Sequence, residues 1–216
     1  MIRTAPEGRW FIAGAWVVAL ALITAAVRTE STGWIVAAVL WWLLAIWVVA
    51  FFRDPERAWS LGERLIVAPA DGKVVSVIEV DEPAFLGGRA QRISIFMNVF
   101  DCHVNRYPTD GRVAYRHYHP GAFGHAGAEK ASLSNEQASV GLATPKGKVL
   151  IRQIAGLIAR RIVTDDQVGT PVRQCERLGM IRFGSRVDLF LPLGTRVLAR
   201  VGDTTRVGVT VVAEWS

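Results

Sequence analysis

The sequence predicts a mostly β, α+β domain preceded by a hairpin of two apolar helices, on the basis of three observations. Two long stretches without a formal charge lie near the start of the chain, at 10–27 and 34–52. After them, short runs of β-branched and aromatic residues alternate with turn signals such as Asp-Gly. The remainder, residues 53–216, is long enough to form one domain with its own core.

The two apolar stretches contain 18 and 19 residues, and each is within the length that a membrane-spanning helix needs. The chain is 51% hydrophobic with a mean hydropathy of +0.27, and much of this excess lies in these stretches. The connector at 28–33 is short and polar, so we expect residues 1–52 to form a membrane anchor with helices at 10–27 and 34–52. An alternative is that the first stretch is a signal peptide, because Ala25-Ala26-Val27 loosely resembles a cleavage site.

The basic residues predict the orientation of this anchor. Arg3 and Arg9 precede the first stretch, and Arg53, Arg57 and Arg64 follow the second. Since positive charges favour the cytoplasmic side, both ends of the hairpin are expected in the cytoplasm. The domain at 53–216 would then lie on the cytoplasmic face of the inner membrane.

The charge of residues 53–216 favours an anionic lipid surface as a partner. This segment holds 22 of the 25 basic and 17 of the 19 acidic residues, which leaves a net charge of +5. It has no run of basic residues interleaved with aromatic ones of the kind that binds single-stranded nucleic acid, so no nucleic-acid partner is expected. Cys102 and Cys175 form no Cys-x-x-Cys pair and are expected to be reduced thiols.

Nine short segments of residues 53–216 have the composition of β-strands, and most of the domain is therefore expected to be antiparallel sheet. One helix is expected from Ile154 to Val163, because apolar residues recur there at helical spacing. The expected strands are 65–67, 73–80, 90–99, 112–119, 148–154, 180–183, 187–191, 197–201 and 206–212.

The segment from Arg182 to Pro192 is the most informative, because Gly184-Ser185 interrupts an otherwise alternating strand. Taken alone, a Gly-Ser pair indicates only a turn or a bulge. On that interpretation the protein is an uncleaved, membrane-tethered, β-rich binding module.

In its wider context this segment resembles the processing site of the short-form bacterial phosphatidylserine decarboxylases, which carry Phe-Gly-Ser followed by a strand that ends in proline. Four further segments resemble the same family in the same order, and the resemblance extends from about Phe52 to the end of the chain. It implies a barrel-like sandwich similar to lipoyl-carrier domains. The four segments are 68–74, 97–108, 118–123 and 153–162.

The resemblance implies that the chain is a proenzyme. Ser185 would attack the carbonyl group of Gly184 and cut the chain into a β subunit, residues 1–184, and an α subunit, residues 185–216. Ser185 would become a covalent pyruvoyl group, the only cofactor expected. This group would form a Schiff base with phosphatidylserine and release carbon dioxide, so that phosphatidylethanolamine is the product. The two fragments would remain together as a heterodimer.

The same resemblance suggests roles for three further residues. Asp71 matches the carboxylate of a serine-activating relay in the longer members of the family, although Asp71-Gly72 also has the composition of a hairpin turn. His103 is the expected proton donor for decarboxylation and the first candidate for the base of self-cleavage. The long form has a second histidine where this chain has Arg106, which we expect to contact the substrate instead.

His117 and His119 are two residues apart in an expected strand, so they should share one face with Val113 and Tyr115. A His-x-His pair permits a metal-dependent hydrolase, but no matching Asp, Glu or Cys is evident nearby, so no metal is expected. We expect His119 to line the substrate pocket instead. Three arginines, Arg152, Arg160 and Arg161, are candidates for contacts with the phosphate of the head group.

Overall fold

The computed structural model describes residues 3–121, 135–156, 161–182 and 185–216. The chain divides into two compact units, a helical unit at Met1–Glu56 and a C-terminal unit at Arg57–Ser216. The boundary lies four residues after the one expected from hydropathy.

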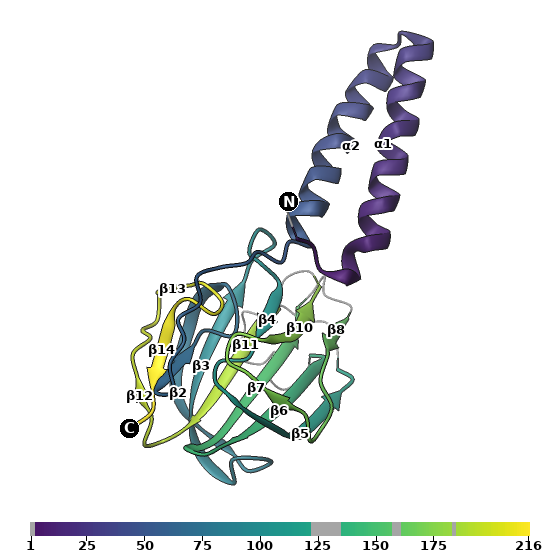
Figure 1. The fold of residues 1–216 in the computed structure, drawn as a ribbon. Coiled ribbons are helices and arrows are strands. Elements are labelled where there is room, and N and C mark those ends of the chain that lie inside the picture. The colour runs from purple at the N-terminus through teal and green to yellow at the C-terminus, as the bar shows by residue number, and fades with distance from the viewer. Residues whose placement is uncertain (1–2, 122–134, 157–160, 183–184) are drawn as a thin grey trace. The chain divides into compact units, whose positions relative to one another are not determined.

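The helical unit is a hairpin of two long helices after a short 3-10 helix, η1 (Pro6–Gly8) (Figure 1). The helices are α1 (Arg9–Thr29) and α2 (Thr32–Phe51), within two residues of the expected bounds. Alanines let the helices approach closely, as Ala19 and Ala45 are almost fully buried between them. The Trp41 indole donates a hydrogen bond of 2.8 Å to the Ala15 carbonyl oxygen. Both helices are long and apolar enough to span a bilayer, which is weak evidence of membrane association.

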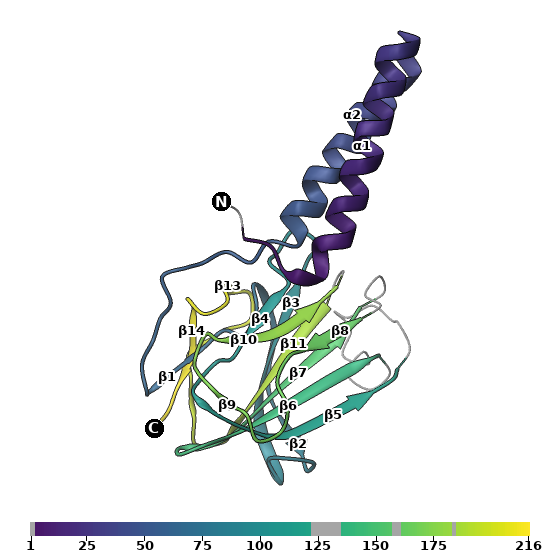
Figure 2. The same ribbon diagram turned by 45° about the vertical axis from the view of Figure 1, so that its right-hand side comes forward.

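The C-terminal unit is built from antiparallel strands, and its largest sheet curls into a half-barrel (Figures 1 and 2). The eight-stranded sheet has the order β13-β2-β3-β11-β7-β6-β5-β9, and two three-stranded sheets have the orders β1-β14-β12 and β4-β10-β8. The strands are β1 (Leu65–Val67), β2 (Gly72–Glu82), β3 (Gly88–Met97), β4 (Val104–Arg106), β5 (Gly111–His119), β6 (Gln137–Thr144), β7 (Gly147–Ala155), β8 (Ile162–Thr164), β9 (Pro171–Val172), β10 (Arg177–Ile181), β11 (Ser185–Pro192), β12 (Arg196–Val197), β13 (Thr204–Thr205) and β14 (Val211–Glu214).

Strand β11 is central to this sheet, with β3 on one side and β7 on the other. Its residues alternate in direction, so Val187, Leu189 and Leu191 enter the main core. On the opposite face, Arg186 and Asp188 form a buried ion pair with a shortest separation of 2.9 Å. Both faces of β11 are therefore covered, which fixes the register of the strand that begins at Ser185.

The predicted fold class is confirmed, whereas several local predictions are wrong. The helix expected from Ile154 to Val163 is wrong at both ends, because Ile154 belongs to strand β7 and Ile162 to strand β8. Residues 157–160, in the middle of that segment, lie outside the described residues. The expected strand at 206–212 is mostly a turn, and only its last two residues enter β14. Strand β5 carries an irregularity between Val113 and Tyr115, so Val113 enters the main core while Tyr115 packs on the other face.

Candidate active site around Ser185

Ser185 is the first residue of β11, and its side chain is fully buried. It pairs with Met97 of β3 and Ala155 of β7, which are also fully buried. Its Oγ atom has no hydrogen-bond partner among the described residues. A buried hydroxyl in this state costs about 1–3 kcal/mol, and what distinguishes Ser185 from other buried serines is its place at the first position of a central strand. Gly184, the other half of the expected junction, lies outside the described residues.

Buried amide side chains hold the two strands that flank Ser185. Gln153 donates a hydrogen bond of 2.8 Å to Asn105, whose own amide lies 3.6 Å from the sulfur of Met97. On the other side, Asn135 donates a hydrogen bond of 2.7 Å to the carbonyl oxygen of Ala155. Sequence reasoning did not select these three residues, although an amide between apolar residues of a strand is a signal for a buried polar contact.

His103 is fully buried and immediately precedes β4. Its carbonyl oxygen accepts a hydrogen bond of 3.3 Å from the amide of Ile181, four residues before Ser185. The Nδ1 atom lies 3.0 Å from the carbonyl oxygen of Asp101, so in the neutral ring Nδ1 carries the proton and Nε2 the lone pair. The pairing of β4 with β10 thus brings His103 to the segment that leads to Ser185.

The carboxylate of Asp71 is bound by an arginine and a backbone amide. Arg57 donates two hydrogen bonds to it, at 2.6 and 2.8 Å, and the amide of Val207 donates a third at 2.7 Å. Asp71 lies at the start of β2, and β3 separates β2 from β11. Asp71 and Ser185 lie at the same end of the sheet. Their strands are not adjacent, because β2 and β11 are two strand spacings apart, about 10 Å.

Arg106 points away from the buried amides. Its guanidinium donates a hydrogen bond of 3.0 Å to the carbonyl oxygen of Cys175 and lies over the ring of Trp59, 4.7 Å from the centroid. Alternation along β4 directs Asn105 and Arg106 to opposite sides. These contacts give Arg106 a packing role.

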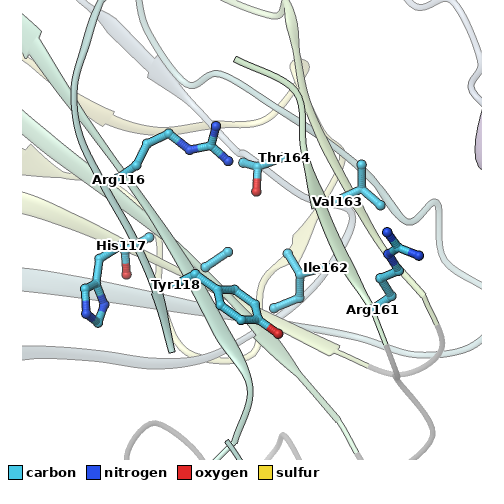
Figure 3. Close-up of a pocket in the computed structure, with 9 residues that line it drawn as sticks. Arg116, His117, Tyr118, Arg161, Ile162, Val163 and Thr164 are labelled. Atoms are coloured by element: carbon cyan, nitrogen blue, oxygen red, sulfur yellow. The ribbon is translucent and has the colours of Figure 1, made fainter. Parts of the chain in front are cut away.

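A pocket of about 420 Å³ opens between β5, β6 and β8. Figure 3 shows that Arg116 and Tyr118 extend from β5 toward the β8 segment, whereas the ring of His117 lies on the other side of the strand. His119 is exposed at the end of β5 and does not line this pocket within the described residues. The lining residues are Arg116, His117, Tyr118, Ala138, Ser139, Arg161, Ile162, Val163 and Thr164.

Strand pairing connects this pocket to Ser185. Tyr118 pairs with Ala138, Ala138 with Gln153, and Gln153 with Val187, two residues after Ser185. Measured along the sheet, three strand spacings separate Tyr118 from β11, about 15 Å. The β8 wall of the pocket is closer to the junction, because the carbonyl oxygen of Arg161 accepts a hydrogen bond of 3.3 Å from the amide of Arg182, three residues before Ser185. The pocket and Ser185 therefore belong to one end of the curled sheet.

The walls of the pocket carry cationic and hydroxyl groups. Arg116 is held by a hydrogen bond of 2.7 Å to the carbonyl oxygen of Asp166, and Arg161 is exposed. The hydroxyl of Tyr118 donates a hydrogen bond of 3.0 Å to Glu136, and this bond raises the pKa of Tyr118 because the carboxylate favours the protonated phenol. Two guanidinium groups and neutral donors suit a phosphate.

Arg152 does not line this pocket, and the ring of His117 lies on the far side of β5 from the β8 segment (Figure 3). Arg152 lies over the ring of Phe190, on the face opposite the core, and approaches Glu82 at 3.5 Å. Arg160 lies outside the described residues. His117 stacks on Tyr115 with a centroid distance of 6.4 Å, and no group of three or more potential metal ligands occurs in the described ranges.

Comparisons of the sequence with known proteins find relatives that cover most of the chain. The profile of the family "Phosphatidylserine decarboxylase" matches residues 44–213. A phosphatidylserine decarboxylase proenzyme of Symbiobacterium thermophilum is 47% identical over 91% of this chain and 92% of its own length. The protein of the same name from Nitrosomonas europaea is 45% identical over 98% of this chain and 94% of its own length.

These matches, which cover the C-terminal unit and its buried serine, define an enzyme of the carboxy-lyase class. The chain belongs to the phosphatidylserine decarboxylase family.

Proposed function

We propose that this chain is a proenzyme that cuts itself between Gly184 and Ser185 and then decarboxylates phosphatidylserine to phosphatidylethanolamine. The observation that carries the proposal is the buried Oγ of Ser185, without a hydrogen-bond partner among the described residues, at the start of a central strand. The relatives that are named proenzymes support the same conclusion.

Self-cleavage needs only atoms of the chain and one water molecule. Ser185 Oγ attacks the carbonyl carbon of Gly184, the C–N bond breaks, and the hydroxyl proton passes to the nitrogen. Loss of the Cα proton of residue 185 then breaks the Cβ–O bond, which frees the Gly184 carboxylate and leaves dehydroalanine. Addition of water and release of ammonia produce the pyruvoyl ketone. His103 is the proposed base, because it is buried and bound to the chain that leads to Ser185.

Sheet pairing is proposed to hold the two fragments together after the cut. In the C-terminal fragment, β11 pairs with β3 and β7, β13 with β2, and β14 with β1, all of which belong to the N-terminal fragment. Asp71 contributes to the same joint, because it binds Val207 of the other fragment. We therefore assign Asp71 first to assembly of the heterodimer, and a relay role for it stays a prediction.

The fully buried position of residue 185 suits a ketone that must react with an amine away from bulk water. Such a ketone supplies an electron sink for the pair released as carbon dioxide leaves. His103 is the proposed donor of the proton that replaces the carboxylate on the substrate carbon. The pocket with Arg116 and Arg161 is proposed to bind the phosphate, for which Arg161 is already a candidate from the sequence. A contact of Arg106 with the substrate stays a prediction, since its guanidinium packs on Trp59 and binds the carbonyl oxygen of Cys175.

The helical hairpin is proposed to anchor the enzyme in the inner membrane, with the C-terminal unit on the cytoplasmic face. Its length and apolarity support a membrane location, and Arg3, Arg9 and Arg53 support this orientation. The substrate and the anionic surface of the bilayer would then be within reach of the same unit.

A denaturing gel combined with mass spectrometry tests the proposal. Purified protein is expected to yield two fragments, and the smaller one should comprise residues 185–216 with an amino terminus that resists Edman degradation. Its mass should correspond to a pyruvoyl group in place of Ser185. A single unmodified chain in fully active material would contradict the mechanism and would favour the uncleaved binding module.

Substitution of Arg161 tests the phosphate pocket. Arg161→Gln is expected to raise KM for phosphatidylserine about 10- to 100-fold with a smaller effect on kcat, because a charge-assisted hydrogen bond to phosphate is lost. Arg196→Gln is the matched control, since this arginine is 73% exposed and pairs with Glu214 outside the pocket. Equal KM values for the two variants would remove Arg161 from the binding site.

A further inference from the structure

Two aromatic side chains of the C-terminal unit stand out by their exposure. Phe100 is 71% exposed and Tyr118 is 58% exposed, and no other aromatic residue in the described part of this unit is equally accessible. Tyr107, Phe190 and Trp215 are buried, as is usual for such large apolar groups. The exposure of Phe100 and Tyr118 is thus a local feature of the surface.

Phe100 occupies a turn that is fixed by hydrogen bonds. The amide of Asn98 donates to the Asp101 carboxylate at 2.8 Å, and the amide of Phe100 donates to the Asn98 side chain at 2.8 Å. The amide of Asp101 also donates to the Asn98 carbonyl oxygen at 3.0 Å. Because the turn is tied at both ends, it holds the exposed ring in a defined place.

This turn is attached to the active site on both sides. Strand β3 ends at Met97, the partner of Ser185, just before the turn. His103 follows the turn, and its Nδ1 atom lies 3.0 Å from the carbonyl oxygen of Asp101. A surface that contacts Phe100 is therefore within a few residues of the reacting groups.

Tyr118 lies on the other flank of Ser185. It is near the end of β5, separated from β11 by β6 and β7, and it lines the proposed phosphate pocket. Its hydroxyl is bound to Glu136, while its ring remains exposed. Together, Phe100 and Tyr118 flank the end of the sheet at which Ser185 begins β11, and we call these two residues the aromatic rim.

We infer that the aromatic rim inserts into the boundary between head groups and acyl chains of a phospholipid bilayer, and so places the mouth of the active site against the lipid. The inference rests on the proposed function, because only a lipid substrate requires this contact. Aromatic rings favour that boundary, where the ring is in an apolar environment and a hydroxyl is hydrated. Residues 57–216 also contain 21 basic and 15 acidic residues, a balance that favours an anionic surface.

Quenching by brominated lipids tests this inference on the full-length protein. Phe100→Cys and the control Val168→Cys are labelled with an environment-sensitive fluorophore and reconstituted into vesicles of phosphatidylcholine and phosphatidylserine. Val168 is 60% exposed and precedes Gly169, whose amide binds Val113 in the first part of β5, away from Ser185. Both natural cysteines are buried, so the unsubstituted chain measures the background of labelling.

The label at position 100 is expected to be quenched several-fold more strongly than the label at position 168 when the phosphatidylcholine carries brominated acyl chains. Phe100→Ser should also raise the surface fraction of phosphatidylserine that gives half-maximal rate, by on the order of tenfold, because an inserted phenyl ring is lost. Val168→Ser should leave that fraction unchanged. Equal quenching at the two positions would overturn the inference. Fragment formation on a gel reports separately on the proposed function.

Discussion

Ser185→Ala is expected to leave one uncut chain of 216 residues with no detectable decarboxylase activity. The alanine has no nucleophile to attack the Gly184 carbonyl and no Cβ–O bond to eliminate, so neither the cut nor the ketone can form. The fold should persist, because Ser185 Oγ makes no hydrogen bond to a described residue and its removal breaks none of those contacts. The measurements are a denaturing gel, the mass of the intact chain and release of carbon dioxide.

Ser94 offers a matched control in the same sheet. It is fully buried in β3, and its Oγ also has no hydrogen-bond partner among the described residues, but it lies within the strand and pairs with Asp188. Ser94→Ala should be cut and active like the unsubstituted protein. Decarboxylase activity in the uncut Ser185→Ala chain would contradict the proposal, because no pyruvoyl group could be present. Loss of self-cleavage in Ser94→Ala would indicate that replacing any buried serine of this sheet prevents the cut.

His103→Ala separates the two roles assigned to this histidine. Loss of decarboxylation in a chain that is still cut would restrict His103 to proton transfer. Loss of both would make it the base of self-cleavage as well. This distinction follows from the position of His103, which is fixed to Ile181 and therefore lies close to the junction in the uncut chain.

The sequence was sufficient for the helices and for most of the long strands. Hydropathy placed α1 and α2 within two residues, because both are apolar around their whole circumference. Residue composition did not predict strand β6, an interior strand of the sheet that is rich in small and polar residues. In this strand Gly141 leaves room for the ring of Phe85. A Cβ at Gly141 would lie 2.6 Å from that ring, so the glycine reflects a tertiary contact that has no local signal.

The candidate site was less accessible to sequence reasoning. Ser185 was identified by a resemblance to the family, and its burial between Met97 and Ala155 depends on strand register. The phosphate pocket combines β5 with β8, which are far apart in the chain and have no detectable pattern in common. The contacts of Arg106 likewise depend on Trp59, from a segment with no periodicity.

Gly179→Ala is expected to destabilise the C-terminal unit by more than about 3 kcal/mol and to reduce self-cleavage strongly. Gly179 has φ of +154° in β10, and a Cβ there would lie 2.0 Å from the carbonyl oxygen of Val163 in β8. The two strands cannot move apart without breaking hydrogen bonds between them, and β10 is also held by its pairing with β4, next to His103. Thermal unfolding should show a decrease in Tm of about 10 °C, and a gel should show uncut chain.

Gly87→Ala separates steric conflict from backbone strain. Gly87 also has a positive φ, +86°, but a Cβ there would meet no atom within 4 Å. Only the cost of the left-handed backbone then applies, on the order of 1 kcal/mol, and the chain should be cut as usual. A similar Tm for the two variants would show that β8 can move away from β10 at little cost. The wall of the phosphate pocket formed by Ile162, Val163 and Thr164 would then be adjustable, and its position would not depend on the close approach of these two strands.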